Sequence, residues 1–514
     1  MQQHNDYLDS ISVDPALHSK IIKKLTEKPA KKPLYYRRAF VYAGAMACMA
    51  VLIFGIWMAS GFRGGGNPDG QQEIQPPAES PLAIEATPPP NPPQEPPTMP
   101  AEFRTISIMH VEGAELIEPR WNIPDHNAAL AARGANDFAF RLGAALAADI
   151  GYDNLVVSPY SVWLPLAALL NATMAEHRPA LLDALGASGL DPEDINRAAS
   201  RMLFDLTNER ARREGWGQWG ASEESALHIA NAIFVDYDVT LRREFAQTFM
   251  DYFRGEMINV DFRSPYAVEE VNLWASYNTN GLITEVVQEF DPLAIAAIAN
   301  AIYFSGRWTY QFDPEQTRRD IFHSPAGDGY AYFMRMEWPF IPYFEDERVQ
   351  AITLPFSGEG GMTIILPKDG NATGLLASMT DEYFERMQSE SVLGEGSLLL
   401  PRFSIENTID NLKDALVALG VPLFDEWAAP LTGGLIEENL YVWVGDAVQV
   451  AMIEVDEEGT TAAAVTVMEI RAESLPIAVT TFEMICNTPF VFVLHSRTTD
   501  GGRQVLFTGV VNQP

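Results

Sequence analysis

Cysteine and histidine are scarce in this sequence. The 514 residues include two cysteines and eight histidines. Cys48 lies in a long apolar run and Cys486 in a strand-like stretch, so the two do not suggest a disulfide framework. No two histidines stand at the spacing of metal ligands on a helix. We therefore expect no metal and no cofactor, and we expect His228, alone in a strand-like run, to be packed and not catalytic.

The familiar catalytic motifs are missing as well. There is no GxSxG elbow, no HExxH, no Gly-rich phosphate loop followed by lysine, and no paired CxxC. No residue is therefore assigned a catalytic role, and the protein is not expected to be an enzyme. A surface hydrolase stays open as a third reading, because the Ser, His and Asp of a triad can lie far apart in the chain.

Basic residues are few relative to acidic ones. Lys and Arg together number 35 against 69 Asp and Glu, which gives a formal net charge of −34. Binding a phosphate backbone requires clustered basic side chains. The composition therefore excludes nucleic acid as an expected partner.

A long uncharged run near the N-terminus predicts a transmembrane helix. Residues 39–60 read AFVYAGAMACMAVLIFGIWMAS, and 22 residues of helix cover roughly 33 Å of hydrocarbon. The preceding segment, 1–38, ends in KKLTEKPAKKPLYYRR, whereas Arg63 is the only basic residue close behind the run. The positive-inside rule then predicts a cytoplasmic N-terminus and an extracytoplasmic remainder. A cleaved signal peptide is the alternative, although both its basic and its apolar region would be unusually long.

The rest of the chain divides into a stalk and one large domain. Residues 61–102 contain GGGNPDG and TPPPNPPQEPPTMP, a composition that favours extended polyproline conformations. Residues 103–514 contain no second linker and mix helix-like with strand-like segments, so one α+β domain is expected. Phe138, Leu142, Leu146 and Ile150 follow a helical spacing, whereas ALHIANAIFVDY and MTIILP are typical of buried strands.

One stretch near the C-terminus has an unusual pattern. Residues 455–470 read VDEEGTTAAAVTVMEI, in which acidic residues precede small, uncharged, strand-prone ones. In a strand, Thr460, Ala462, Ala464 and Thr466 would form one uniformly small face. Such a face suits a segment that slides between two existing strands, with Gly459 as a flexible start. An ordinary interior strand after an acidic turn is the alternative.

This stretch resembles the hinge of the serpins, the serine protease inhibitor family whose reactive loop inserts into its own central sheet. Further stretches resemble serpin landmarks in the same order along residues 127–514: NLVVSPYSV, IANAIFV, VNLWASYNTNGLI, IANAIYFSGRW, LPF with IILP, LPRFSIE, NTPFVFVLH and VLFTGVVNQP. The resemblance implies a fold of three β-sheets and about nine helices with an exposed loop. It also implies that a protease cuts the loop, forms its acyl-enzyme and is trapped as the loop inserts.

The resemblance assigns roles to particular residues. The inhibitory hinge consensus is matched by six of them: Glu457, Gly459, Thr460, Ala462, Ala463 and Ala464. Thr461 departs from it, since the family usually has Glu there, and Gln449 stands where the family usually has a His that helps to close the sheet. No basic cluster resembles a glycosaminoglycan site, because Arg210, Arg212 and Arg213 are typical of a solvated helix face; heparin binding is therefore not expected.

Counting along the loop places the scissile bond. The spacing common in inhibitory members gives Glu473-Ser474, and a protease that accepts Glu must offer a cation or hydrogen-bond donors. A loop shorter by two residues gives Arg471-Ala472 and a trypsin-like target. A cysteine protease is a further candidate target. The apolar run together with the resemblance to serpins implies a monomeric, membrane-anchored protease inhibitor outside the cytoplasm, with a non-inhibitory serpin-fold binding or structural protein as the alternative.

Overall fold

The computed structural model describes residues 126–206, 226–460 except 280, 292, 358–359 and 439, then 480–498 and 502–514. All of them belong to one compact unit, Pro93–Pro514. The predicted cytoplasmic segment, transmembrane helix and stalk (1–38, 39–60 and 61–102) lie outside the described residues. So do Cys48, Arg210, Arg212 and Arg213. Within the described part of the chain, every helix is too short or too polar to cross a bilayer.

The described residues form nine α-helices and two short 3-10 helices. They are α4 (His126–Ala147), α5 (Pro159–Leu169), α6 (Arg178–Ala184), α7 (Pro192–Leu206), α9 (Arg243–Phe253), α10 (Ala267–Asn278), α11 (Ala372–Ala377), α12 (Asp381–Ser389), α13 (Leu412–Ala418), η2 (Pro314–Gln316) and η3 (Pro422–Phe424). The helix predicted from Phe138, Leu142 and Leu146 is α4, where all three are buried, whereas Ile150 lies beyond its end.

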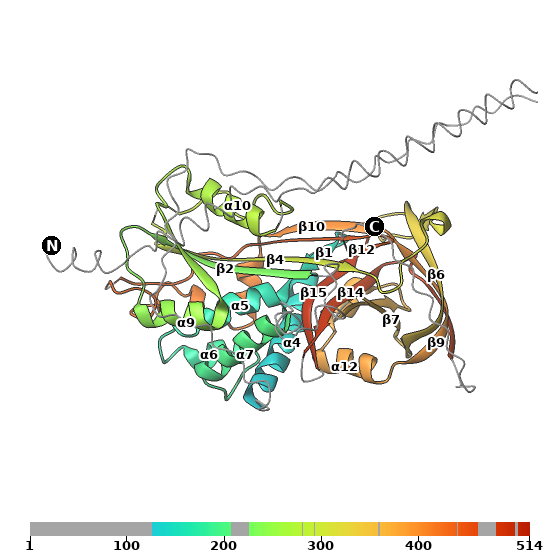
Figure 1. Cartoon of the computed structure of the whole chain (residues 1–514), viewed down its shortest axis with the longest axis horizontal. Coiled ribbons are helices and arrows are strands. Elements are labelled where there is room, and N and C mark those ends of the chain that lie inside the picture. Colours follow the sequence, from blue (N-terminus) through green and yellow to red (C-terminus); the bar gives the residue numbers. More distant parts are fainter. Residues whose placement is uncertain are drawn as a thin grey trace, which may run out of the picture. The chain divides into compact units, whose positions relative to one another are not determined.

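The strands form three sheets (Figure 1). The largest has the order β1-β15-β14-β8-β7-β6-β9-β13, with β5 on the edge of β6. Its strands are β1 (Leu155–Val157), β5 (Arg318–Phe322), β6 (Gly329–Glu345), β7 (Val349–Pro355), β8 (Gly361–Pro367), β9 (Val392–Pro401), β13 (Thr480–Ile485), β14 (Phe490–Arg497) and β15 (Arg503–Val511). The predicted strand MTIILP is β8, which is buried along its whole length because sheet neighbours and helices cover it.

Two smaller sheets carry the region that the sequence singled out. One has the order β12-β4-β2-β3, and the other pairs β10 with β11. Their strands are β2 (Ala226–Asp236), β3 (Gly255–Val260), β4 (Ala296–Arg307), β10 (Phe403–Ile409), β11 (Gln449–Val455) and β12 (Gly459–Thr460). The expectation of three sheets and about nine helices is thus confirmed for the described residues. His228 lies in β2, opposite Tyr303 of β4.

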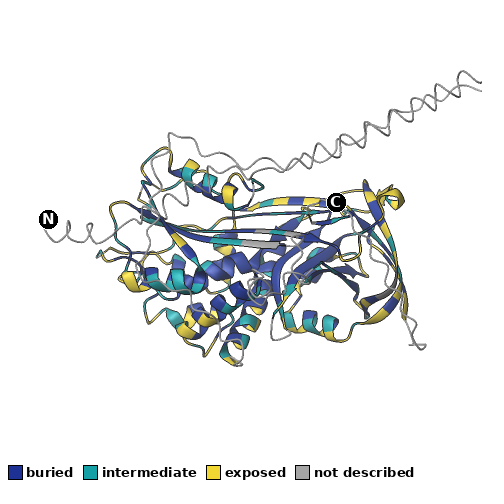
Figure 2. Cartoon of the chain, viewed as in Figure 1, coloured by how far each residue is buried: buried dark blue, intermediate teal, exposed yellow. Residues whose placement is uncertain are grey.

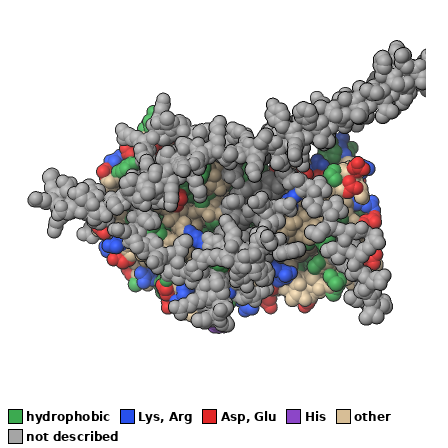
Figure 3. Space-filling model, viewed as in Figure 1, with side chains coloured by type: hydrophobic (Ala, Val, Ile, Leu, Met, Phe, Trp, Pro, Cys, Tyr) green, Lys and Arg blue, Asp and Glu red, His purple; other side chains and the backbone are tan. Residues whose placement is uncertain are grey.

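Buried residues lie in the interior and exposed ones mainly on the outer faces of the helices and strands (Figure 2), and the buried hydrophobic residues form two core clusters. The main core lies where α4 and α5 pack against β14 and β15, and it holds fully buried Phe138 and Trp163. A second core cluster, around Phe234 and Trp274, lies under α10 on the other face of β2, β3 and β4. Cys486 is also buried and forms no disulfide, and burial raises the pKa of its thiol. On the face drawn in Figure 3, acidic and basic side chains are interspersed along the margin.

One buried histidine in the large sheet sets an expected pH dependence. His495 on β14 is 4% exposed, and its Nε2 lies 3.0 Å from the hydroxyl oxygen of Thr363. Burial, with smaller effects of the Arg503 and Arg497 guanidinium groups, lowers the pKa of His495 to about 3. The folded chain therefore keeps this imidazole neutral where an unfolded chain protonates it.

We expect this imidazole to weaken the fold in acid. The part of the free energy of unfolding that depends on the neutral imidazole is fully present above about pH 6.5 and is lost as the pH falls toward 3. The free energy of unfolding should change by at most about 1.4 kcal/mol per pH unit in this range. Chemical denaturation between pH 4 and 7 measures that slope. H495Q should flatten it, whereas the exposed His323→Gln should not. An unchanged slope in H495Q would contradict the assignment.

Candidate functional site

The hinge stretch crosses from one small sheet to the other. β11 pairs antiparallel with β10, and β12 begins four residues after β11 ends and pairs antiparallel with β4. Gly459 stands opposite Arg307, and Thr460 stands opposite Gly306. The acidic residues 456–458 therefore form the turn that joins the sheets.

Asp456 shapes this turn through its backbone and side chain. Its carboxylate oxygen accepts hydrogen bonds from the backbone N–H of Glu458 (2.9 Å) and of Gly459 (3.1 Å). Its own N–H donates to the Gly459 carbonyl at 3.0 Å, and its carbonyl accepts from the Trp308 indole at 2.9 Å. Burial raises the pKa of Asp456 despite these two donors to its carboxylate. Three hydrogen bonds thus close the turn, and the fourth ties it to Trp308.

Gly459 occupies a backbone position that other residues rarely adopt. Its φ is +146°, and a Cβ there would lie 2.1 Å from the Gly306 carbonyl oxygen and 2.7 Å from the Cα of Arg307. Close approach to β4 and positive φ therefore both require glycine. The role of Gly459 as a hinge stays a prediction.

Glu457 anchors the turn to the rest of the fold. It is 5% exposed, and its carboxylate accepts hydrogen bonds from Arg402 Nε (2.9 Å), Arg402 Nη2 (2.6 Å) and the Thr317 hydroxyl. Its carbonyl accepts from the Phe312 N–H at 3.0 Å. A buried carboxylate with several donors is well compensated for its lost hydration.

The end of β4 closes over the turn from the other side. The Trp308 N–H donates to the Glu458 carbonyl at 3.0 Å, and its indole stacks on Phe356 with ring centroids 4.8 Å apart. The buried Arg307 guanidinium lies 3.5 Å from the Glu458 carboxylate. The hinge is therefore fixed at the end of β4, while the strand bodies behind it remain separate.

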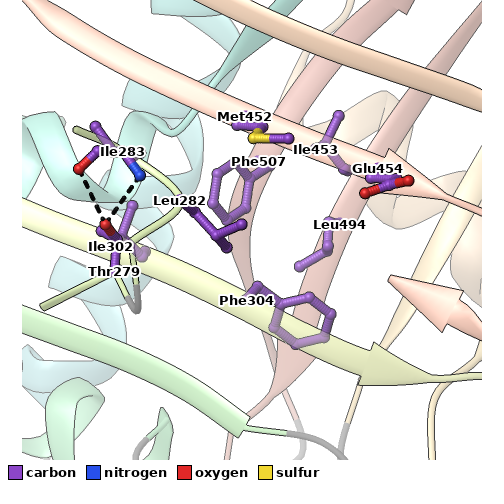
Figure 4. A pocket seen from close by; sticks show the side chains of 10 residues that line it. All are labelled: Thr279, Leu282, Ile283, Ile302, Phe304, Met452, Ile453, Glu454, Leu494 and Phe507. Atoms are coloured by element: carbon purple, nitrogen blue, oxygen red, sulfur yellow. Dashed lines mark hydrogen bonds between the residues drawn. The ribbon is translucent and has the colours of Figure 1, made fainter. Parts of the chain in front are cut away.

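Behind the hinge, β4 and β11 lie on opposite sides of a gap (Figure 4). Within the described part of the chain the two strands share no ladder. A cavity of about 30 Å³ lies between them, lined mainly by apolar residues: Thr279, Leu282, Ile283, Ile302, Phe304, Met452, Ile453, Glu454, Leu494 and Phe507. A cavity of this size holds about one water molecule. The gap is therefore filled by side chains that would have to move before another strand could enter.

Two features of the gap concern how it is covered. Thr279, Leu282 and Ile283, which follow α10, line the cavity, and the Thr279 hydroxyl oxygen accepts from the Ile283 N–H at 3.1 Å (Figure 4). Glu454 of β11 also lines the cavity, and burial, with a smaller effect of Asp456, raises the pKa of its carboxyl.

Side-chain hydrogen bonds fasten the two strands to different elements. The Gln449 side chain accepts from the Ser158 N–H (3.0 Å) and donates to the Ser158 carbonyl (2.9 Å) and the Ser161 hydroxyl (2.6 Å). This ties β11 to α5. Asn300 of β4 instead donates to Asn231 of β2 at 2.7 Å. The two sides of the gap are therefore held by different neighbours.

Comparison with known proteins identifies the architecture. A family model described as serpin (serine protease inhibitor) matches residues 133–514. The chain belongs to the serpin family. An uncharacterised serpin-like protein of Thermococcus kodakarensis is 30% identical over 393 residues, covering 74% of this chain and 84% of that protein. Human neuroserpin is 28% identical over 381 residues, covering 70% of this chain and 86% of that protein. The structure of human thyroxine-binding globulin with thyroxine matches with a TM-score of 0.64 at 22% identity, covering 76% and 99%.

The serpin hinge residues predicted from the sequence fall on both sides of the described boundary. Glu457, Gly459 and Thr460 lie together at the end of β4. The remaining predicted residues, namely Thr461, Ala462, Ala463, Ala464 and both candidate bonds, Glu473-Ser474 and Arg471-Ala472, lie outside the described residues. They stay predictions. Among the described residues of this serpin, no group of three or more His, Cys, Asp or Glu side chains could hold a metal ion.

Sequence reasoning missed several residues that hold the hinge. Arg402, Trp308 and Thr317 contact it directly, yet each lies more than 50 residues before it in the chain. Two of them stood inside stretches that resembled serpin landmarks, Arg402 in LPRFSIE and Trp308 in IANAIYFSGRW. The available signal for Arg402 was its basic side chain next to β10, the strand that pairs with β11 just before the acidic turn.

Gln449 in this serpin should contribute strongly to stability. Truncation to alanine removes three buried hydrogen bonds and leaves the Ser158 N–H without its acceptor, whereas the Ser158 carbonyl and the Ser161 hydroxyl keep the bond between them. We expect Q449A to lower the free energy of unfolding by about 2–3 kcal/mol. Denaturant titration measures it, with the exposed Gln316→Ala as control. Equal midpoints for the two variants would show that Gln449 is not a structural link.

Proposed function

We propose that this serpin inhibits serine proteases as a suicide substrate, with residues 461–479 as bait. The hinge geometry carries the proposal. β12 pairs antiparallel with β4 at the edge of the gap, and a chain that continued this pairing would run between β4 and β11. The small side chains that follow Thr460 fit a strand that must enter a filled interior.

The chemistry belongs to the protease. Its serine oxygen attacks the carbonyl carbon of the bait residue, and the peptide bond to the next residue breaks. The leaving amino group takes the proton that the serine gave up through the protease histidine. An ester then joins the two proteins, and insertion of the cut loop moves the protease before water hydrolyses that ester. The serpin is consumed and is not an enzyme.

The scissile bond decides the target class. Glu473-Ser474 is the bond we favour, and it selects a protease whose pocket offers donors to a carboxylate. Arg471-Ala472 is the alternative and selects a trypsin-like protease. A cysteine protease stays a further candidate, since its thiolate would form the corresponding thioester.

Membrane anchoring is part of the proposal. Residues 39–60 would cross the bilayer, 1–38 would lie in the cytoplasm, and 61–102 would hold the domain away from the outer surface. Alkaline extraction of membranes tests this. The chain should stay in the pellet, and a variant lacking 39–60 should be released. Release of both would refute the anchor.

Reaction with proteases tests the inhibitory function. The full chain in detergent is mixed with a Glu-specific and with a trypsin-like serine protease and analysed on denaturing gels and by mass spectrometry. A boiling-resistant adduct with a cut after Glu473 or Arg471 supports the proposal. T460R is the matched control, because a long charged side chain at the first position of the inserting strand should give cleavage without adduct.

A non-inhibitory binding protein is the second candidate, because the matched thyroxine-binding globulin is named for a ligand. It predicts cleavage without adduct in the wild type as well, and no gain in melting temperature after the cut.

A further inference from the structure

The sequence contains two acceptor motifs for N-linked glycans. In two places Asn is followed by Ala and then Thr, at Asn171 with Thr173 and at Asn371 with Thr373, and no other Asn has Ser or Thr two positions later. Such a motif is modified only where a transferase reaches the asparagine amide. Because the two motifs have the same three residues, the fold decides which of them carries a sugar.

Asn171, which follows α5, is enclosed by hydrogen bonds. Its Nδ2 donates to the Ala168 carbonyl at 3.1 Å and to Asn196 Oδ1 at 2.9 Å, and its Oδ1 accepts from Asn196 Nδ2 at 2.9 Å. Thr173 of the same motif is 1% exposed, and its hydroxyl donates to the Leu169 carbonyl at 2.8 Å. Both amide hydrogens of Asn171 are in use. A sugar on Nδ2 would therefore break the contact between α5 and α7.

Asn371 is exposed and lies directly before α11. Its Oδ1 accepts from the Gly374 N–H at 2.9 Å and so caps the start of the helix. None of the residues that the structure describes accepts a hydrogen bond from its Nδ2. An N-linked glycan is attached through Nδ2 and leaves the carbonyl oxygen unchanged. The helix cap and a glycan on Asn371 are therefore compatible.

The surroundings of Asn371 leave room for a sugar. A Cβ at position 374 would lie 2.4 Å from Asn371 Nδ2, so Gly374 keeps the amide nitrogen uncovered. A cavity of about 450 Å³ opens beside the amide, and Tyr152, Asp369 and Asn512 are among the residues that line it. An aromatic ring together with a few polar groups around a hollow is a common lining of small-molecule sites. The first sugar of a glycan could therefore pack beside the Tyr152 ring, which is 60% exposed.

We propose that Asn371 carries an N-linked glycan, transferred from a lipid-linked oligosaccharide by a membrane-bound transferase. Nδ2 attacks C1 of the first sugar, the bond between C1 and the lipid phosphate oxygen breaks, and the lipid phosphate leaves as an anion. A base of the transferase takes the proton that Nδ2 gives up. The inference rests on the proposed function, because the membrane anchor places this domain outside the cytoplasm, where N-linked glycans occur.

A glycan at this position leaves the hinge free. β8 begins beside the Trp308–Phe356 stack at the hinge, where Gly361 pairs with Pro355, and Asn371 lies beyond its other end. A strand rises about 3.3 Å per residue, so the seven residues of β8 span roughly 20 Å. Loss of the glycan should therefore leave the formation of protease adduct unchanged.

Mass spectrometry tests the inference on the full chain, isolated in detergent from membranes of its own organism. The peptide containing Asn371 should carry a mass increment of sugar residues, and the peptide containing Asn171 should not. T373A removes the motif but keeps the Asn371 cap, so it should lose the increment and migrate faster on denaturing gels. T373S keeps the motif and should keep the glycan. Both variants should form protease adduct as the wild type does.

The outcomes separate this inference from the proposed anchor. An unmodified Asn371 in a chain that stays in the pellet after alkaline extraction overturns the inference and leaves the anchor intact. A glycan that persists in T373A, or one found on Asn171, overturns it as well. Release of the chain from membranes together with an unmodified Asn371 refutes the anchor, and this inference with it.

Discussion

Replacing Gly459 with alanine should destabilise the fold and abolish trapping. The new Cβ would lie 2.1 Å from the Gly306 carbonyl oxygen at a φ of +146°, so β12 must leave β4. Backbone strain of this kind costs about 1–3 kcal/mol, and the clash adds to it. We expect a lower melting temperature and a protein that proteases cleave without forming adduct.

G327A is the matched control for backbone strain. Gly327 has a φ of +127°, and nothing lies within 4 Å of a Cβ built there. It therefore carries the conformational cost without the contact with β4. If G459A melts like G327A and still forms adduct, the pairing of β12 with β4 is not needed for insertion.

Removing the Glu457 carboxylate should have the second large effect. In E457A, Arg402 loses both hydrogen bonds and Thr317 loses its acceptor, in a place where Glu457 is 5% exposed. Because Arg402 remains half-exposed, we expect a loss of about 2–3 kcal/mol, below the range for fully buried pairs. The freed hinge should also raise self-association after mild heating, because unpaired strand edges template further pairing.

Two comparisons isolate the ion pair. E337A removes the partner of Arg335 at the exposed surface, where a pair with an N to O distance of 3.1 Å should contribute less than about 1 kcal/mol. The charge exchange E457R/R402E should recover part of the stability if charge pairing dominates. Thermal melts and size-exclusion chromatography measure both effects. Equal losses in E457A and E337A would contradict the assigned role of Glu457.

The serpin fold was predictable from the sequence, whereas the contacts around the predicted hinge were not. The order of landmark stretches was enough to predict the fold, because local pattern determines each stretch, and the role of the hinge residues stays a prediction. The contacts of Arg402 and Trp308 with the acidic turn depend on strands that approach one another only after folding. The spacing of these residues in the sequence therefore does not predict the contacts.

Gln449 shows a different limit. Its departure from the family pattern was visible in the sequence, but its consequence was not. The structure gives the amide three bonds to Ser158 and Ser161, all toward α5. An amide does not titrate, so this fastening of β11 should hold equally in mildly acidic and neutral surroundings, unlike an imidazole at that position.

Within the described residues, β4 and β11 face each other without backbone pairing. This arrangement also bears on what a heating experiment on this protein measures. If residues 461–479 insert between β4 and β11 as proposed, the native arrangement is less stable than the inserted one and persists because of a barrier. Its stability is then described by a half-life at a given temperature, and not by an equilibrium free energy of unfolding. Faster heating should give higher apparent melting temperatures. Stored protein should lose activity at a rate that the height of this barrier determines.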